Sequence, residues 1–310
     1  MNLKQLKYVV EIVRQNNRLS AAAEALNTSQ PGVSRQIQLL EHELGIEVFQ
    51  RTRNRIIGLT DPGAVVFETA SRIANDIKLL QSLTEDMKTA SSGALTIATT
   101  HAQARYILPK VITKFVKAYP KVEIALKQGN PEDICTMVND GEADIGMCGD
   151  TLKSYPDLAK LSCFGVSRSV VAKRGHPILS VRKMTLNAIA QYPIVTYDAR
   201  YSGRWRVMKA FNQAGIEPKI ILSATDADVS KTYIELGLGI GVISTITFDP
   251  KRDKGLRARP ADHLFEPSTI YVYMRRNSYL RQYMTDFIRS VAPQLTAAVI
   301  KRAMQQRLAD

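Results

Sequence analysis

The chain has 310 residues, 45% of them hydrophobic and 23% charged, a composition that fits about two globular domains with sizeable cores. No run of about 18 apolar residues is present, so we expect no membrane-spanning helix. The net charge of +13 indicates an anionic partner, either nucleic acid or a smaller anion. Because residues 1–88 are nearly neutral, the excess lies in residues 89–310, where a solvated basic face is the alternative to an anionic ligand.

The N-terminal segment and the cysteines indicate the cellular compartment. MNLKQLKYVVEIVRQNNRLS lacks the apolar stretch and the cleavage site of a signal peptide. Cys135, Cys148 and Cys163 are odd in number and show no paired spacing, as expected for free, buried thiols in a reducing compartment. We therefore predict a cytoplasmic protein.

Three helices are predicted in the first 45 residues. The first runs near residues 2–16, where apolar residues recur at helical spacing, and the second covers SAAAEAL, with Ser20 as its N-cap. The third begins after Thr28–Ser29 with Pro31 in its first turn and stops at Gly45. Two short helices joined by a tight turn are the helix-turn-helix pattern, and the alternative is a plain helical bundle.

The outer face of the third helix carries side chains suited to reading DNA. When such a helix enters the major groove, glutamine pairs with adenine, and arginine pairs with guanine or phosphate. Next, IEVFQRTRNRIIGLT reads as two short strands around a turn at Arg53–Asn54, whose arginines form a wing against the phosphate backbone. The predicted DNA-binding residues are Ser29, Gln30, Pro31, Ser34, Arg35, Gln38, Arg51, Arg53 and Arg55.

A long helix is predicted after the wing. Thr60, Asp61 and Pro62 form a cap-like start, and the residues that follow include a heptad seam with alternating steps of four and three. We predict that this helix pairs two chains, and the alternative is packing against its own domain. The seam consists of Val66, Ala70, Ile73, Ile77, Leu80, Thr84 and Met87. Thr89–Gly93 reads as a polar linker to the next domain.

From residue 94 onward, strand-like and helix-like runs alternate. The strand-like runs are ALTIAT, VEIALKQ and ADIGMCG, followed by RSVVAK, PIVTYD, KIILSA and IGVIS; helices are predicted near 104–118, 131–140, 203–214 and 226–237. The pattern predicts an α/β domain in two similar halves, with TIYVYMRR returning the chain to the first half. Ligands of such folds bind beyond the carboxyl ends of the strands, in the cleft between the halves.

Four strand-to-helix turns are the predicted ligand-binding segments: Thr99–Gln103, Cys148–Asp150, Tyr201–Gly203 and Ala224–Asp226. Free backbone N–H groups at the helix starts, together with threonine and glutamine donors, favour an anion. The alternative for each turn is a capped helix start with no ligand.

The segment TSQPGVSRQIQLLEHELGIEVFQRTRNRIIGLTDPG resembles the signature of LysR-type transcriptional regulators. It holds S-Q-P-x-V-S-x-Q-I, L-E-x-E-L-G, x-F-x-R and L-T-x-x-G in order at matching spacing. The resemblance implies a homodimer or homotetramer on a pseudo-palindromic operator in double-stranded DNA, with RNA polymerase as a candidate partner. The domains expected are a winged helix-turn-helix at 1–59, a linker and dimerisation helix with a hinge at 60–92, and a two-lobed, periplasmic-binding-protein-like effector domain at 93–310. Within the effector domain, lobe I is expected at about 93–165 and 267–310, and lobe II at about 166–266.

Several segments of the effector domain resemble the CysB/Cbl branch of that family, the regulators of sulfur assimilation. These are IATTHAQARYILP, QYPIVTY, SGR and SATDADVSKTYIELGLGIGVI, and the similarity runs nearly from end to end. The resemblance implies a cleft that binds sulfate or a related sulfur-containing anion through hydroxyls and an amide.

Residue by residue, the match to this branch is incomplete. Thr100 and Gln103 match it and Ser202 keeps a hydroxyl, whereas Ala102 and Gly149 replace threonines. The loss of two hydroxyl donors is expected to weaken the binding of sulfate, and the smaller side chains leave room for a larger anion. The candidate effectors are therefore sulfate, thiosulfate, a sulfonate and adenosine phosphosulfate. The predicted effector-binding residues are Thr99, Thr100, His101, Ala102, Gln103, Gly149, Tyr197, Ser202 and Thr225.

Other classes of protein fit the residues less well. The G-x-G-x-G at Gly237–Gly241 lacks the dinucleotide-binding spacing and precedes a strand, so we interpret it as a tight turn. His42, His101, His176 and His263 show no metal-binding spacing, and no G-x-S-x-G is present. We therefore predict that the protein is not an enzyme and that it binds neither a cofactor nor a metal ion. The DNA-binding pattern also disfavours a periplasmic binding protein, while a LysR-type regulator of a different pathway with a non-sulfur effector stays open.

Overall fold

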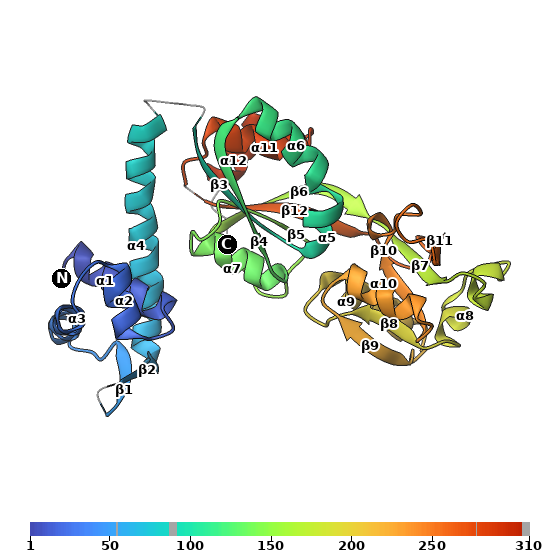
Figure 1. Cartoon of the computed structure of the whole chain (residues 1–310), viewed down its shortest axis with the longest axis horizontal. Helices are drawn as coiled ribbons and strands as arrows, with labels where there is room; N and C mark the ends of the chain where they lie inside the picture. The colour runs from blue at the N-terminus through green and yellow to red at the C-terminus, as the bar shows by residue number, and fades with distance from the viewer. Residues whose placement is uncertain (54, 87–91, 277, 306–310) are drawn as a thin grey trace. The chain divides into compact units, whose positions relative to one another are not determined.

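The computed structural model describes residues 1–53, 55–86, 92–276 and 278–305 and divides the chain into two compact units, residues 1–88 and 89–310 (Figure 1). Each unit has its own hydrophobic core. Among the described residues, no helix combines the length and the apolar character needed to cross a bilayer. The predicted fold class, an α-rich N-terminal region followed by a two-lobed α/β domain, is confirmed.

The first unit begins with α1 (Leu3–Arg14), α2 (Leu19–Ala25) and α3 (Gln30–Leu44). Helix α3 starts as predicted, because the Ser29 side chain accepts the Gly32 N–H, and it ends at Gly45 in the left-handed conformation with φ 67°. Helix α2 starts before Ser20, with Arg18 at the N-cap and no side-chain cap, so the predicted capping role of Ser20 is wrong. Leu19 packs against the core of this unit and brings the helix start forward.

The predicted hairpin follows α3. Strands β1 (Phe49–Thr52) and β2 (Arg55–Leu59) pair antiparallel, and Arg53 in their turn has a φ of 47°. The helices and the hairpin share one core, whose fully buried members include Val9, Ile12, Val33, Ile37, Leu40, Val48 and Phe49. The first unit is therefore a helix-turn-helix with an attached wing.

Helix α4 (Asp61–Asp86) begins where the sequence predicts. The Thr60 hydroxyl accepts the Gly63 N–H at 2.9 Å, and the first turn holds Asp61. Gly63 lies so close to the preceding chain that a Cβ there would be 1.9 Å from the Val48 carbonyl oxygen. Only glycine therefore allows α4 to start against the hairpin.

The first half of the predicted heptad seam packs within its own unit. Ala70 is fully buried in the core of the first unit, and Val66 and Ile73 are partly buried against that core. The prediction that Ala70 contacts a second chain is wrong, because the helices of its own unit cover it. These turns of α4 pack against their own domain, which is the alternative that the sequence left open.

The second half of the seam is more open. Ile77 is half-exposed and the Leu80 side chain is 64% exposed. The side chain of Thr84 and all of Met87 lie outside the described residues. A second chain therefore has access to α4 around Leu80, and dimerisation along this part stays a prediction.

The second unit consists of two lobes, each built on a five-stranded mixed sheet. Lobe I (residues 92–166 and 268–305) has the strand order β4-β3-β5-β12-β6. The first three are parallel, and β12 runs antiparallel to β5 and β6. The strands are β3 (Ser92–Thr99), β4 (Lys121–Gln128), β5 (Ile145–Cys148), β6 (Leu158–Val166) and β12 (Ser268–Arg275).

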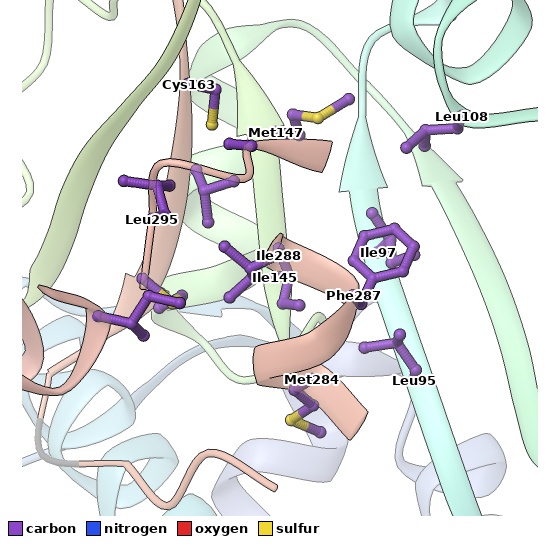
Figure 2. Close-up of a cluster of buried hydrophobic side chains, with 14 of the residues drawn as sticks. Leu95, Ile97, Leu108, Ile145, Met147, Cys163, Met284, Phe287, Ile288 and Leu295 are labelled. Carbon is purple, nitrogen blue, oxygen red and sulfur yellow. The ribbon is translucent and has the colours of Figure 1, made fainter. Parts of the chain in front are cut away.

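Helices pack on the sheet of lobe I and close its core. Figure 2 shows Leu95 and Ile97 of β3 facing Phe287 and Ile288 of α11, with Ile145 of β5 beside them. The helices of this lobe are α5 (His101–Tyr106), α6 (Leu108–Ala118), α7 (Pro131–Asn139), α11 (Gln282–Val291) and α12 (Ala297–Gln305).

Lobe II (residues 167–267) repeats this arrangement. Its strand order is β11-β7-β10-β8-β9, in which β10, β8 and β9 are parallel and β7 is antiparallel to both of its neighbours. The elements are β7 (Arg168–Lys173), η1 (Pro177–Ser180), α8 (Leu186–Ala190), β8 (Ile194–Tyr197), α9 (Ser202–Gln213), β9 (Ile220–Ala224), α10 (Ala227–Glu235), β10 (Ile240–Ser244), η2 (Thr245–Thr247) and β11 (Leu256–Pro260). The prediction of two similar halves, with β12 returning to the first, is confirmed.

Three details differ from the sequence predictions. The helix predicted at 104–118 is two helices, α5 and α6, because Pro109 in the first turn of α6 prevents a continuous helix. Ser92 and Gly93 belong to β3 and not to the linker. Strands β6 and β11 and helices α8 and α12 were not predicted. The interpretation of Gly237–Gly241 as a tight turn is confirmed, since Gly237 has a φ of 90° and strand β10 follows.

Candidate ligand cavity and nucleic-acid interface

A cavity of about 70 Å3 lies between the two lobes of the second unit. Its walls come from the turns that follow β3, β5 and β9 and from the starts of α5, α9 and α10. The structure brings together eight of the nine predicted effector-binding residues on these walls: Thr100, His101, Ala102, Gln103, Gly149, Tyr197, Ser202 and Thr225. The four predicted turns therefore converge on a single site, as expected for the carboxyl ends of parallel strands.

Thr99 is the exception. It is fully buried in the last position of β3, and its hydroxyl donates to the Met147 carbonyl oxygen of the neighbouring strand at 2.9 Å. Thr99 does not line the cavity, so its predicted contact with a ligand is wrong. Its hydroxyl instead fixes β3 to β5, next to the turn that carries the site.

Arg168, at the start of β7, is a buried cationic residue that lines the cavity. It is 3% exposed, and its Nη2 donates to the Ser268 hydroxyl, while Nη1 donates to the Val166 and Ser167 carbonyl oxygens at 3.5 and 3.3 Å. None of these partners carries a charge, and Nε has no partner among the described residues. Burial lowers the pKa of Arg168, yet a guanidinium remains protonated.

A buried charge without a counter-ion is costly, so it normally has a partner. Arg168 lines the cavity, which makes an anion bound there the expected partner. Arg168 is not among the predicted effector-binding residues, because RSVVAK signals only a buried strand, and no spacing distinguishes a strand arginine that faces solvent from one that faces a cavity.

Other polar groups on the walls also lack partners. Gln103 Oε1 and Ser244 Oγ are buried without a hydrogen bond in the described part of the chain. Thr100 occupies the N-cap of α5 without a side-chain capping bond, and Ser202 opens α9, whose N-cap is equally uncapped. The three hydroxyls and the N–H groups at the start of α9 supply donors to an anion, whereas Gln103 Oε1 is an acceptor.

A network of ion pairs joins the lobes beside the cavity. Asp228 of α10 accepts from His101 Nε2 at 2.8 Å and from the Tyr106 hydroxyl at 2.7 Å, and it pairs with Arg105 and Lys231. Desolvation by burial works to raise the pKa of Asp228, but the bonds from Tyr106 and His101 and the nearby cations bring it below its ordinary value. Asp228 is therefore a carboxylate that holds α5 of lobe I to α10 of lobe II.

Within the described part of the chain, this region also contains a group of potential metal ligands. Ligand atoms of His101, Asp226 and Asp228 lie within 4.8 Å of one another. Because Asp228 already pairs with two cationic side chains, its charge is compensated without a metal. The absence of a metal and of a cofactor stays a prediction.

On the first unit, α3 and the wing share a groove of about 350 Å3. Five of the predicted DNA-binding residues line it: Gln30, Pro31, Ser34, Gln38 and Arg51. Ser29 caps α3 outside this groove, while Arg35, Arg53 and Arg55 are exposed elsewhere on α3 and the wing. These residues form a polar surface that fits a nucleic-acid interface.

Glu41 of α3 supports this surface, although it is not among the predicted DNA-binding residues. Its Oε1 accepts the N–H groups of Val48 and Phe49 at 2.9 and 3.1 Å, and its Oε2 pairs with Arg51 at 2.7 Å. Glu41 is 8% exposed, so it fixes the wing to α3 from inside. The sequence carries no signal for this role. The helical periodicity of α3 places Glu41 beside its apolar positions, but it does not show which groups the carboxylate contacts.

A winged helix-turn-helix combined with a two-lobed domain that holds a small cavity defines a DNA-binding transcriptional regulator with a ligand-sensing domain. Comparison with known proteins agrees. The chain matches the LysR substrate binding domain over residues 88–296 and the bacterial regulatory helix-turn-helix protein of the lysR family over residues 3–64.

Individual relatives match over nearly the whole chain. The chain is 45% identical over 306 residues to the HTH-type transcriptional regulator SsuR of Burkholderia cenocepacia, covering 99% of both chains. It is 42% identical over 305 residues to the HTH-type transcriptional regulator CysB of the same organism, covering 98% of this chain and 97% of that one. The solved cofactor-binding domain of the Cbl transcriptional regulator matches with a TM-score of 0.67 at 38% identity, covering 70% of this chain and 95% of that one.

The chain belongs to the LysR family of transcriptional regulators, in its CysB/Cbl-like branch. The prediction of a DNA-binding transcriptional regulator from the branch that governs sulfur metabolism is thereby confirmed. The relatives are transcriptional regulators and not enzymes.

Proposed function

We propose that this regulator responds to a small sulfur-containing oxyanion that binds between the lobes against Arg168, and that occupancy of this site changes how the protein binds DNA. The observation that carries the proposal is the buried guanidinium of Arg168, which lines the cavity and has no charged partner among the described residues. An oxyanion supplies the missing counter-charge, and charge-assisted hydrogen bonds are stronger than neutral ones.

The size of the cavity selects among the candidate effectors. At about 70 Å3 it is well below the roughly 300–1,000 Å3 of sites for drug-sized ligands. Sulfate, thiosulfate and the head of a short sulfonate fit this size. The adenosyl part of adenosine phosphosulfate would have to lie outside the cavity. We therefore favour the smaller anions.

Thermal unfolding of the full chain tests this proposal. The panel is sulfate, thiosulfate and ethanesulfonate, with chloride at equal ionic strength as the control. A ligand at about 100 times its Kd stabilises the protein by roughly 2.7 kcal/mol, which raises the Tm by a few degrees. A rise with a sulfur anion and none with chloride supports the proposal. An unchanged Tm with all three sulfur anions contradicts it and favours an effector without sulfur.

Gly149 is expected to set the choice between sulfate and larger anions. A Cβ at Gly149 would lie 2.4 Å from the Ser202 hydroxyl oxygen, the end of a side chain that can rotate away. Gly149→Thr adds one donor to the cavity and removes space. Because a hydrogen bond to a charged group contributes about 1.5–3 kcal/mol, we expect Gly149→Thr to bind sulfate roughly tenfold more tightly and ethanesulfonate less tightly. Calorimetry measures both; a parallel loss for the two anions would count against this role.

For the DNA interface, we propose that α3 reads bases and the wing contacts phosphates. Arg35→Ala is then expected to cost about 1–3 kcal/mol on the preferred operator and to relax its sequence specificity. Arg53→Ala is expected to weaken binding equally on all sequences and to reduce the salt dependence by about one phosphate contact. Fluorescence anisotropy at several salt concentrations measures both effects, with Lys7→Ala on α1 as the control. Equal behaviour of the two arginine variants would contradict the assignment.

The remaining assignments complete the proposal. We assign residues 1–59 to DNA binding, 60–92 to linkage and dimerisation, and 93–310 to effector binding. The exposed apolar residues Val65 and Leu80 on α4, each 64% exposed, support a homodimer or homotetramer. A dimer meets two half-sites, which favours a pseudo-palindromic operator. RNA polymerase is a candidate partner, and the cytoplasm is the compartment where DNA is accessible.

A further inference from the structure

The cavity between the lobes continues into a second, outer compartment of about 280 Å3. Four residues line both compartments: His101, Tyr201, Thr225 and Asp226. The outer compartment is completed by Gln128, Gly129, Asn130, Asp133 and Arg200. Asp226 lies where the two compartments adjoin, so a ligand longer than the inner cavity has room to extend into the outer one.

Two side chains that line the outer compartment already have polar partners within the protein. Arg200 pairs with Asp198 at 2.8 Å, and His101 contacts Asp228 at 2.8 Å. Asp226 and Asp133 differ, because neither forms an ion pair with a residue that the structure describes. Asp133 accepts the N–H and side-chain amide of Asn130 in the capping box of α7. The outer compartment therefore presents the Asp226 carboxylate without an ion-pair partner among the described residues, whereas the inner one presents the guanidinium of Arg168 without a charged partner.

Asp226 lies at the junction of the two compartments. One of its oxygens, Oδ1, accepts the Val229 N–H at 2.8 Å and caps α10, and Oδ2 has no hydrogen bond within the described part of the chain. The side chain is half-buried, so its charge is only partly solvated. Gln103, on the inner wall, adds a buried amide oxygen without a donor. A simple oxyanion carries acceptors only and satisfies neither oxygen.

We propose that the effector is zwitterionic, with an oxyanion head against Arg168 and an ammonium group that pairs with Asp226 on the outer side. A short aminoalkylsulfonate has this chemistry. The inference rests on the proposed function, because it assigns the head of the ligand to the same cavity. It adds the second recognition element, which separates an aminosulfonate from simple sulfonates and from inorganic sulfate by charge complementarity.

Calorimetry on the full chain tests the inference with three sulfonates that share a head and a two-carbon chain. They are 2-aminoethanesulfonate, 2-hydroxyethanesulfonate and ethanesulfonate, measured at pH 7, where the amine is protonated. We expect 2-aminoethanesulfonate to bind at least about tenfold more tightly than ethanesulfonate, with the hydroxy compound near ethanesulfonate.

Asp226→Asn is the matched variant, because asparagine retains the cap of α10 and removes only the charge. We expect Asp226→Asn to reduce the preference for the amine over ethanesulfonate to less than about threefold. Asp262→Asn, at an exposed position outside both compartments, serves as the control and keeps the full preference.

Two results would overturn the inference. One is equal or weaker binding of the amine in the unsubstituted protein, which leaves the sulfur-anion site in place. The other is a full preference for the amine in Asp226→Asn. A third result has a different meaning. If none of the three sulfonates binds and the protein does not respond to sulfate or thiosulfate, the proposed function itself is contradicted.

Discussion

Arg168→Met is expected to abolish binding of the effector without destabilising the free protein. Truncating one partner of a buried charge pair typically costs about 2–5 kcal/mol of binding, so the affinity for thiosulfate or a short sulfonate should fall roughly 30-fold or more. In the free protein the same substitution removes a buried charge that has no counter-ion. That gain offsets the bonds lost at Ser268 and at the carbonyl groups of Val166 and Ser167.

Calorimetry and urea unfolding separate these two effects. The expected result is lost affinity with a free energy of unfolding within about 1 kcal/mol of the unsubstituted protein. Arg259→Met is the matched control, because Arg259 donates to the Leu179 and Val181 carbonyl oxygens in the same lobe but does not line the cavity. Arg259→Met should retain affinity. Unchanged anion binding in Arg168→Met would refute the role of this guanidinium.

Glu41→Ala is expected to have the largest effect on the first unit. It leaves the buried N–H groups of Val48 and Phe49 without an acceptor and Arg51 without its carboxylate. Leaving a buried backbone donor unsatisfied costs about 1–3 kcal/mol each, and the pair with Arg51, whose side chain is 31% exposed, contributes less. Because the wing is attached through these bonds, we expect the first unit to unfold at lower urea concentration and DNA binding to be lost.

Binding of the anion in the second unit should be unaffected in Glu41→Ala, since that unit has its own cores. Glu41→Gln keeps an acceptor for the backbone and should be intermediate. Glu43→Ala, on the exposed side of the same helix, serves as the control and should change stability by less than about 0.5 kcal/mol. Equal effects of Glu41→Ala and Glu43→Ala would contradict the role of Glu41 in holding the wing.

The main elements of the fold were predictable because their signals are local. Ser29, Pro31 and Gly45 bound α3 by capping and turn chemistry, and alternating runs bounded by turns predicted most strands of both lobes. The break between α5 and α6 also had a local signal, Pro109, which the prediction of one continuous helix ignored. Few elements with a clear local signal were therefore predicted wrongly.

The errors at the sites have a different origin, since they depend on contacts between distant residues. Ala70 fits a heptad seam, but packing against α1 decides which face of α4 is covered. Arg168 and Ser268 are separated by 100 residues and meet only when β12 returns to lobe I. Glu41 and Arg51 meet because the chain reverses between α3 and the wing. Periodicity describes one element at a time, so it carries no information on these pairs.

The effect of the anion on DNA binding tests the central claim most directly. The full chain is used to select its preferred operator from random-sequence DNA, and the affinity for that operator is measured with and without thiosulfate or 2-aminoethanesulfonate. Ionic strength is held constant, because DNA binding depends strongly on salt. The expected result is a change in affinity or footprint in the unsubstituted protein that is absent in Arg168→Met, as linkage between the two sites requires. An identical response in Arg168→Met, or no response in either protein, would contradict an anion sensor built on Arg168.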